Sequence, residues 1–247
     1  MCCVEWWPVF TSRATRLLGI DPARRHPVQQ GFGGPWGAPY VALLDHIEEK
    51  GYADDLPLDP QGVLAVNVPF CAGFVECPIL LRWLQRLMER CPAITRINVL
   101  AVDLDKDFER AWQQKMEWAA KQYPNISLQL RPANLLQETL PEAGLTLCMH
   151  PGPITEQASD PWPQIMTTVL KAVATNGFCV FAVFSQHELR AVVKTCSDCA
   201  MTTTATTPNP YYETHPAPLP CLAFCGPLVG FPYGIAYMRY LHVVHRG

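Results

Sequence analysis

The fold of this chain is decided by residues 63–102, which read VLAVNVPFCAGFVECPILLRWLQRLMERCPAITRINVLAV. This stretch begins and ends with short apolar runs, residues 63–68 and 97–102. Between them, residues 79–90 carry leucine and methionine at the three- and four-residue spacing of a helix with one apolar face. Short continuous apolar runs are typical of strands that are buried on both faces. The stretch therefore predicts a strand, a helix and a second strand of a parallel sheet.

The same alternation continues toward the C-terminus. Further apolar runs predict strands at residues 126–130, 145–149 and 178–184. Segments with helical periodicity predict helices at residues 106–123, 162–174 and 186–194. Strands that alternate with helices predict a Rossmann-like α/β fold, in which a mostly parallel sheet is covered by helices on both faces.

Ligands of such sheets bind beyond the carboxyl ends of the strands, near the point where the strand order reverses. We therefore expect the functional site on the loops that follow the predicted strands. These candidate loops are residues 69–73, 103–107, 131–134 and 150–155.

The first 60 residues form a predicted N-terminal extension to a main domain of residues 61–247. The extension is rich in glycine and proline, and a helix is expected at residues 41–50. It also contains the aromatic residues Trp6, Trp7, Phe10, Phe32 and Trp36. Disordered tails are poor in aromatic residues, so we expect this segment to pack against the main domain. It is either a lid over the site or ordinary packing on the edge of the sheet.

The C-terminal part is predicted to add an antiparallel hairpin to the sheet. The threonine-rich residues 202–210 are expected to form a polar loop. Residues 219–225 and 233–244 are expected to form two strands, joined by a Gly/Pro-rich turn at residues 226–232.

Composition and charge exclude several classes of function. The net charge is -3 and the pI is about 6.1, so we expect no binding to nucleic acid or to an anionic membrane. The N-terminus lacks the basic segment and apolar run of a signal peptide. The apolar residues 216–244 contain too many prolines and glycines for a membrane helix. We therefore expect a cytoplasmic protein.

The eleven cysteines are scattered through the sequence, several of them in apolar runs, which is typical of buried reduced thiols rather than of a disulfide framework. Cys196 and Cys199 form a C-x-x-C pair, and Cys221 and Cys225 follow it. Four thiolates are able to hold zinc, but the alternative is a set of unrelated thiols. Because the second pair has irregular spacing, we expect no bound metal.

Two segments carry a resemblance to a known family. Residues 99–103, VLAVD, look like a strand with a terminal acid, and residues 169–181, VLKAVATNGFCVF, look like a helix, a turn and the fifth strand. With the C-terminal hairpin, this layout resembles the class I S-adenosylmethionine-dependent methyltransferases over residues 62–240. The resemblance implies a Rossmann-like fold and binding of S-adenosylmethionine.

The loop after the first predicted strand departs from the family pattern of an acid followed by Gly-x-Gly-x-Gly. Asn67 stands at the position of the acid, while Pro69 and Cys71 stand where glycines are usual. Only Gly73 matches a family glycine. Asn67 and Gly73 are nevertheless the candidate cofactor-binding residues of this loop by position.

Three further candidate site residues follow predicted strands. The resemblance implies that Asp103 binds the ribose of the cofactor, but an aspartate here is equally suited to the N-terminus of the next helix. Asn134 is a candidate contact of the adenine or a plain loop residue. His150 is the candidate catalytic base or a structural histidine. Asp105 and Asp107 are expected to cap the following helix.

These observations support three hypotheses about function. The first is a methyltransferase that uses S-adenosylmethionine to modify a small molecule, with His150 as its base. The second is a methyltransferase-like domain that has lost the cofactor and serves as a binding or assembly protein. The third is a zinc-bearing protein that uses the four late cysteines. Fold alone does not decide among them.

Overall fold

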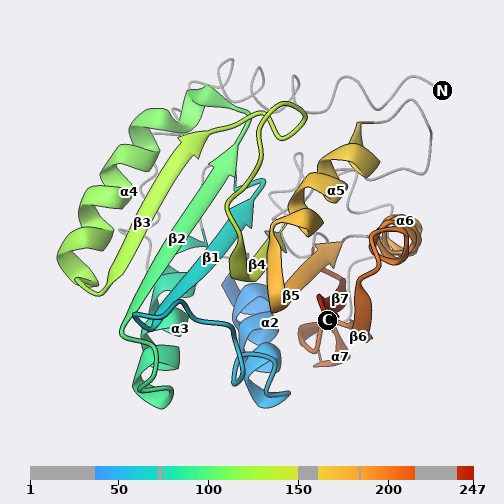
Figure 1. Cartoon of the computed structure of the whole chain (residues 1–247), viewed down its shortest axis with the longest axis horizontal. Coiled ribbons are helices and arrows are strands. Elements are labelled where there is room, and N and C mark those ends of the chain that lie inside the picture. Colours follow the sequence, from blue (N-terminus) through green and yellow to red (C-terminus); the bar gives the residue numbers. More distant parts are fainter. Residues whose placement is uncertain (1–36, 72–73, 75, 150–160, 184, 215–237) are drawn as a thin grey trace.

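One sheet of seven strands, in the order β3-β2-β1-β4-β5-β7-β6, forms the centre of the computed structural model (Figure 1). The structure describes residues 37–71, 74, 76–149, 161–183, 185–214 and 238–247. The strands are β1 (Val63–Pro69), β2 (Arg96–Asp103), β3 (Ile126–Pro132), β4 (Ala143–Met149), β5 (Val173–Val183), β6 (Thr202–Pro208) and β7 (Tyr240–His245). Strands β1 to β5 pair in parallel, and β7 runs antiparallel to both β5 and β6.

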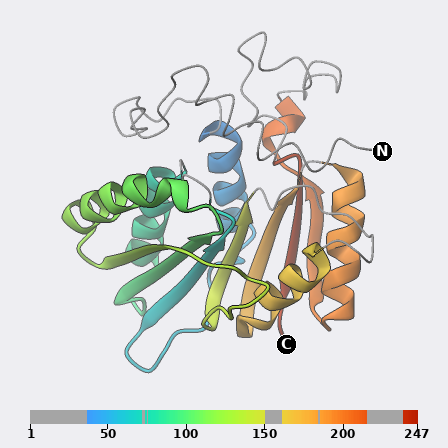
Figure 2. The same ribbon diagram turned by 90° about the horizontal axis from the view of Figure 1, so that it is seen from above.

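Helices cover both faces of this sheet (Figure 2). They are α2 (Gly37–Glu49), α3 (Cys77–Arg90), a 3-10 turn at Lys106–Phe108, α4 (Glu109–Gln122), α5 (Trp162–Lys171), α6 (Gln186–Asp198) and the short α7 (Tyr211–Thr214). One apolar cluster joins α2, α3 and α4 to the sheet, and a second joins α5 and α6 to the opposite face. The predicted Rossmann-like fold with helices on both faces is therefore confirmed. None of the helices in the described part of the chain has the length and apolar character needed to cross a membrane.

The central strands form where their apolar runs predict them. All seven residues of β4 are buried, and β1 has only two residues that are not. Strand β3 lies at one edge of the sheet, and only Ile126 and Leu130 of its seven residues are buried. A strand with neighbours and helices on both sides must be apolar throughout, whereas an edge strand need not be. The apolar runs of the central strands are therefore the clearest secondary-structure signal in the sequence.

The C-terminal antiparallel addition is confirmed, but its expected segments are wrong in part. Residues 202–208, expected to be a loop, form strand β6. Strand β7 is hydrogen-bonded to β5 on one side and to β6 on the other. The segments at residues 219–232 lie outside the described residues. The prediction of a loop failed because β6 is an exposed edge strand built from β-branched threonine, which lacks the apolar signal of a buried strand.

The turn expected before the fifth strand lies within β5. The pairing of β4 with β5 jumps from Ala143 opposite Val173 to Leu145 opposite Phe178, so extra residues loop out of β5. Asn176 has a φ of 60°, and a Cβ on Gly177 would lie 2.8 Å from the carbonyl oxygen of Ala174. Glycine is therefore required at position 177 by close approach of the backbone.

Candidate functional site

The candidate site lies where the order of the strands reverses. From β1 the chain moves outward to β2 and β3, and it then returns to place β4 on the other side of β1. The carboxyl ends of β1 and β4 therefore lie side by side. In open α/β sheets this is the position at which ligands bind.

Two non-glycine residues in the described part of the loop after β1 adopt unusual backbone conformations. Phe70 and Phe74 have φ angles of 62° and 47°, in the left-handed region that non-glycine residues avoid. Each such residue costs about 1–2 kcal/mol and persists only where its surroundings hold it in place. Pro69 and Cys71, at the positions of family glycines, do not have positive φ angles. The loop thus places its left-handed residues one position away from the expected ones.

Two contacts hold this loop over the sheet. The backbone N–H of Cys71 donates to the carbonyl of Val102 at 3.2 Å, which ties the loop to the end of β2. The ring of Phe70 meets the ring of Trp162, at the start of α5, edge to face at a centroid distance of 5.3 Å. The loop is therefore anchored to elements on both sides of β1.

Asn67 lies in β1 and is buried rather than exposed at the rim of the site. Its side-chain Nδ2 donates to the carbonyl of Pro141 at 2.8 Å, in the crossover that precedes β4. A carboxylate has no proton to donate to a carbonyl. This bond explains in physical terms why asparagine stands where the resembled family has an acid.

Asp103 ends β2 at the edge of the candidate site and is partly exposed. Its Oδ1 accepts a hydrogen bond from the backbone N–H of Asp105 at 3.0 Å, so it shapes the turn that leaves the strand. Asp105 in turn accepts from the N–H of Asp107 at 2.9 Å and is the N-cap of the 3-10 turn. The predicted capping role of Asp105 is confirmed. Asp103 is the last residue of β2, two positions before this cap.

Asn134 follows β3 and organises its own loop. Its Oδ1 accepts from the N–H of Leu136 at 3.1 Å, and its backbone N–H donates to Glu138 at 3.0 Å. Glu138 also pairs with Arg131 at 2.8 Å, and the hydrogen bond from that guanidinium lowers the pKa of the Glu138 carboxyl. The loop-residue interpretation of Asn134 is the one its contacts support. Gly73 and His150, the other two predicted site residues, lie outside the described residues.

A buried polar cluster that the sequence did not reveal lies beneath the loop. Tyr40 of α2, Glu76 before α3 and Lys115 of α4 are all buried. Burial raises the pKa of the Tyr40 hydroxyl well above its ordinary value, with the nearby Glu76 carboxylate adding to the shift, and lowers the pKa of Lys115. The Tyr40 hydroxyl has no hydrogen-bond partner among the described residues. The signal for Lys115 was its place with Trp112 and Ala119 on the inward stripe of α4.

The cysteines of this region are not activated nucleophiles. Burial, the largest cause, raises the pKa of Cys77 to about 12 and that of Cys71 further. Reactive cysteines need a lowered pKa, because the thiolate is the nucleophile. Cys71 and Cys77 therefore act as small apolar residues at neutral pH.

The cysteines on the opposite face show no metal-binding arrangement within the described residues. The sulfurs of Cys148 and Cys179 lie 3.8 Å apart in the core. Cys196 is buried and Cys199 is partly exposed at the end of α6. No group of three histidine, cysteine or acidic residues in the described ranges is arranged to hold a metal. Cys221 and Cys225 lie outside those ranges.

The sequence matches no family model and no curated protein. Solved structures match the fold. Magnesium protoporphyrin IX methyltransferase from Synechocystis PCC 6803, with bound SAH, has a TM-score of 0.55 and 13% identity over 96% of this chain and 98% of its own. The chain has the fold of the class I S-adenosylmethionine-dependent methyltransferases.

A second methyltransferase structure has the same architecture. Loganic acid methyltransferase with SAH has a TM-score of 0.54 and 8% identity, over 87% of this chain and 98% of its own. An O-methyltransferase family protein from Burkholderia thailandensis has a TM-score of 0.49 and 9% identity, over 85% of this chain. This chain spans only 57% of that protein's length. At such identities the likeness to this methyltransferase fold is one of architecture.

Proposed function

We propose that this chain is a methyltransferase that uses S-adenosylmethionine to methylate a small molecule. The observation that carries the proposal is the position of Asp103. Its partly exposed carboxylate ends β2 next to the loop of β1, in a fold of which two of the solved structures above contain bound SAH. A carboxylate there is suited to accept hydrogen bonds from the two hydroxyls of a ribose.

The residues of this chain would then serve mainly to position the reactants. When bound, S-adenosylmethionine supplies the methyl group, and in-line placement of the acceptor against it accounts for most of the rate enhancement. Asp103 holds the cofactor, and His150, which follows β4 in the sequence, is the proposed base for the acceptor. Gly73 is proposed to give the cofactor close access to the backbone. Asn67 and Asn134 are engaged by the protein's own hydrogen bonds, so their main role is structural.

The test is calorimetric binding of S-adenosylhomocysteine to three proteins: the wild type, Asp103→Ala and Asp105→Ala. A hydrogen bond to a charged group contributes about 1.5–3 kcal/mol. We therefore expect Asp103→Ala to weaken binding by roughly ten- to a hundredfold, at about 1.4 kcal/mol per factor of ten. Asp105→Ala is the matched control, because Asp105 caps the 3-10 turn and should change the affinity by less than about threefold. Equal effects of the two substitutions would reject the role of Asp103.

The second candidate is a binding or assembly protein with a methyltransferase fold and no cofactor. It is favoured by the loop after β1, in which phenylalanines occupy the left-handed positions and Asn67 is tied to Pro141. If wild-type protein shows no binding at millimolar S-adenosylhomocysteine while its fold is intact, this second function replaces the first.

A further inference from the structure

Three buried polar side chains lie together at the start of α3. Tyr40 of α2 is fully buried, Glu76 before α3 is 8% exposed, and Lys115 of α4 is 4% exposed. They supply a hydroxyl donor, a carboxylate acceptor and a cationic donor. Lysine and glutamate are almost never buried this deeply unless they are paired. The cluster therefore needs partners that complete its hydrogen bonds.

The three side chains do not satisfy one another. The hydroxyl of Tyr40 has no hydrogen-bond partner among the described residues. Burial lowers the pKa of Lys115 and the nearby Cys77 and Glu76 oppose this shift, yet no ion pair within the described part of the chain includes Lys115. The Glu76 carboxylate does not cap its own helix. An internal ion pair would account for the two charges but would leave the Tyr40 hydroxyl unpaired, which is rare for a buried polar group.

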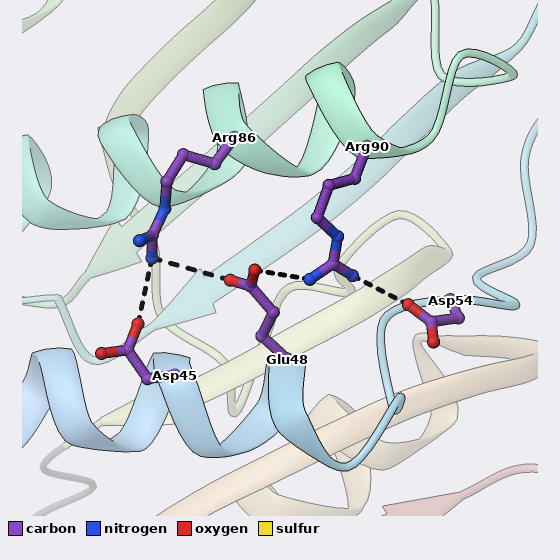
Figure 3. A network of polar contacts seen from close by, with 5 residues as sticks. All are labelled: Asp45, Glu48, Asp54, Arg86 and Arg90. Carbon is purple, nitrogen blue, oxygen red and sulfur yellow. Dashed lines mark hydrogen bonds and ion pairs between the residues drawn. The ribbon is translucent and has the colours of Figure 1, made fainter.

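The packing of α2 along α3 places Tyr40 in this cluster. Asp45 of α2 pairs with Arg86 of α3 at 3.0 Å (Figure 3). Glu48, one turn later in α2, pairs with Arg90, one turn later in α3. Because residue numbers rise together along this contact, the two helices run parallel. Tyr40, in the first turn of α2, therefore lies beside the first turn of α3.

A series of backbone hydrogen bonds connects the cluster to the end of β2. The N–H of Cys71 donates to the carbonyl of Val102 at 3.2 Å. The N–H of Phe74 donates to the carbonyl of Cys71 at 2.6 Å, and the N–H of Cys77 donates to the carbonyl of Phe74 at 3.2 Å. These bonds lead from the residue before Asp103 to the first residue of α3. The cluster therefore lies one loop away from the carboxylate proposed to hold a ribose.

We propose that this cluster binds the zwitterionic amino-acid end of S-adenosylmethionine, with Tyr40 and Lys115 donating to its carboxylate and Glu76 accepting from its ammonium group. The assignment rests on the proposed function. A zwitterion adds no net charge to the interior, and it gives each buried charge an opposite partner that offsets the cost of desolvation. Asp103 then holds the ribose while the cluster holds the other end of the same ligand.

The departures from the family pattern favour this arrangement. Asn67, at the position of the family's acid, donates its side-chain N–H to the carbonyl of Pro141. Pro69 has no backbone N–H to offer a ligand. The N–H groups of Cys71 and Phe74 are already bonded to backbone carbonyls. These described groups at and around the loop are therefore engaged or absent, whereas the donors beneath it are not.

Entry of a ligand to this cluster requires the loop after β1 to shift. Phe70 and Phe74 have left-handed backbone conformations, with φ angles of 62° and 47°. Strain of this kind is concentrated at ligand clamps and switch regions. It lowers the cost of moving these two residues away from their present conformation.

Calorimetric binding of two ligands separates the amino-acid end from the rest of the cofactor. S-adenosylhomocysteine has this end, and 5'-methylthioadenosine is an adenosine thioether without it. We expect Lys115→Met to weaken binding of S-adenosylhomocysteine by roughly ten- to a hundredfold and Tyr40→Phe by roughly tenfold, because each variant loses a hydrogen bond to a charged group. Both variants should bind 5'-methylthioadenosine within about threefold of the wild type, which also shows that they are folded.

Lys121→Met, on an exposed position of α4, and Tyr52→Phe, beyond the C-terminal end of α2, are the matched controls. Both should bind the two ligands as the wild type does. Equal weakening of both ligands in Lys115→Met and Tyr40→Phe would show that the cluster only supports the fold and would overturn the proposal.

Two further results would also overturn it while leaving the proposed function in place. They are unchanged binding of S-adenosylhomocysteine in both variants, and a wild type that binds 5'-methylthioadenosine as tightly as S-adenosylhomocysteine. A wild type that binds neither ligand would reject the proposed function, and the assignment of the cluster with it.

Discussion

At the scale of single residues, burial fixes the protonation states and the hydrogen-bond partners of the polar side chains in the interior. Asp103 and Asp105 were identified from the sequence because acids at strand ends and helix starts have a general physical reason to be there. The partner of Asn67 was not predictable, since Pro141 lies 74 positions away and only the fold brings the two together. The same holds for Tyr40 of α2, Glu76 just before α3 and Lys115 of α4, which are far apart in the sequence.

The hydrogen bond of Asn67 makes a counter-intuitive prediction about restoring the family's acid. Asn67→Asp removes the donor to Pro141 and buries a carboxylate. We expect it to lower the free energy of unfolding by about 2–4 kcal/mol, because an unpaired buried charge costs more than a lost neutral bond. Urea denaturation at pH 7 measures the change. Asn98→Asp, on an exposed position of the neighbouring β2, is the control and should change it by less than about 0.5 kcal/mol. A harmless Asn67→Asp would show that the bond to Pro141 contributes little.

The lowered pKa of the buried His242 side chain should make the stability of the fold depend on pH. The ring is fully buried in β7, its Nδ1 lies 2.8 Å from the Thr206 hydroxyl, and burial lowers its pKa to about 4. The unfolded chain has the ordinary value of about 6.5, so it binds more protons than the folded chain between these two values. Stability therefore falls as the pH is lowered from 6.5 to 4, by up to about 3 kcal/mol.

Denaturation midpoints measured from pH 4 to pH 7 check this slope. His242→Asn should flatten it, because asparagine keeps a polar atom near Thr206 and does not titrate. His187→Asn, at an exposed position of α6, should leave the slope as in the wild type. An unchanged slope in His242→Asn would assign the pH dependence to other groups.

At the scale of elements, predictability followed burial. Strands β1 and β4 are almost wholly buried, β2 and β5 are buried or half-buried throughout their C-terminal halves, and all four are visible as apolar runs. Strand β6 was missed because its threonines are mostly exposed, and its pairing with β7 depends on residues about 40 positions apart. The amphipathic helices were recognised because each buries one stripe, although their ends differ from the expected ones by several residues.

The inward stripe of α4 contains one element-scale prediction. Lys115 is buried there between Trp112 and Ala119, and burial lowers its pKa, so the folded state disfavours its charge. We expect Lys115→Met to raise the free energy of unfolding at pH 7 by about 1–2 kcal/mol, because a buried charge is replaced by an apolar side chain of similar length. Lys121→Met, on an exposed position of the same helix, is the control. A loss of stability in Lys115→Met would mean that its ammonium is held by a favourable partner such as Glu76.

At the scale of the whole molecule, the alternation of strands and helices predicted a parallel sheet but not the order of its strands. That order depends on which side of β1 each crossover takes, and short-range patterns do not record this choice. The reversal between β1 and β4 nevertheless decides where the site lies, since it brings the loop after β1 next to the end of β4. The candidate site therefore follows from the expected architecture, while the contacts of its residues depend on segments far apart in the sequence.

The proposed cofactor should be visible in the stability of the whole chain. A ligand that binds only the folded state at a concentration of about 100 times its Kd adds about 2.7 kcal/mol. For a chain of 247 residues this corresponds to a rise in Tm of about 5–10 °C, at roughly 2–4 °C per kcal/mol. We expect S-adenosylhomocysteine to produce this rise in the wild type and in Asp105→Ala. Asp103→Ala should reach the same rise only at a roughly ten- to hundredfold higher ligand concentration, because each factor of ten in Kd corresponds to about 1.4 kcal/mol. Differential scanning fluorimetry over a ligand series measures both effects, with adenine alone as a control for non-specific stabilisation. A flat Tm up to millimolar ligand in all three proteins would remove the physical basis for catalysis and leave the fold as a binding scaffold.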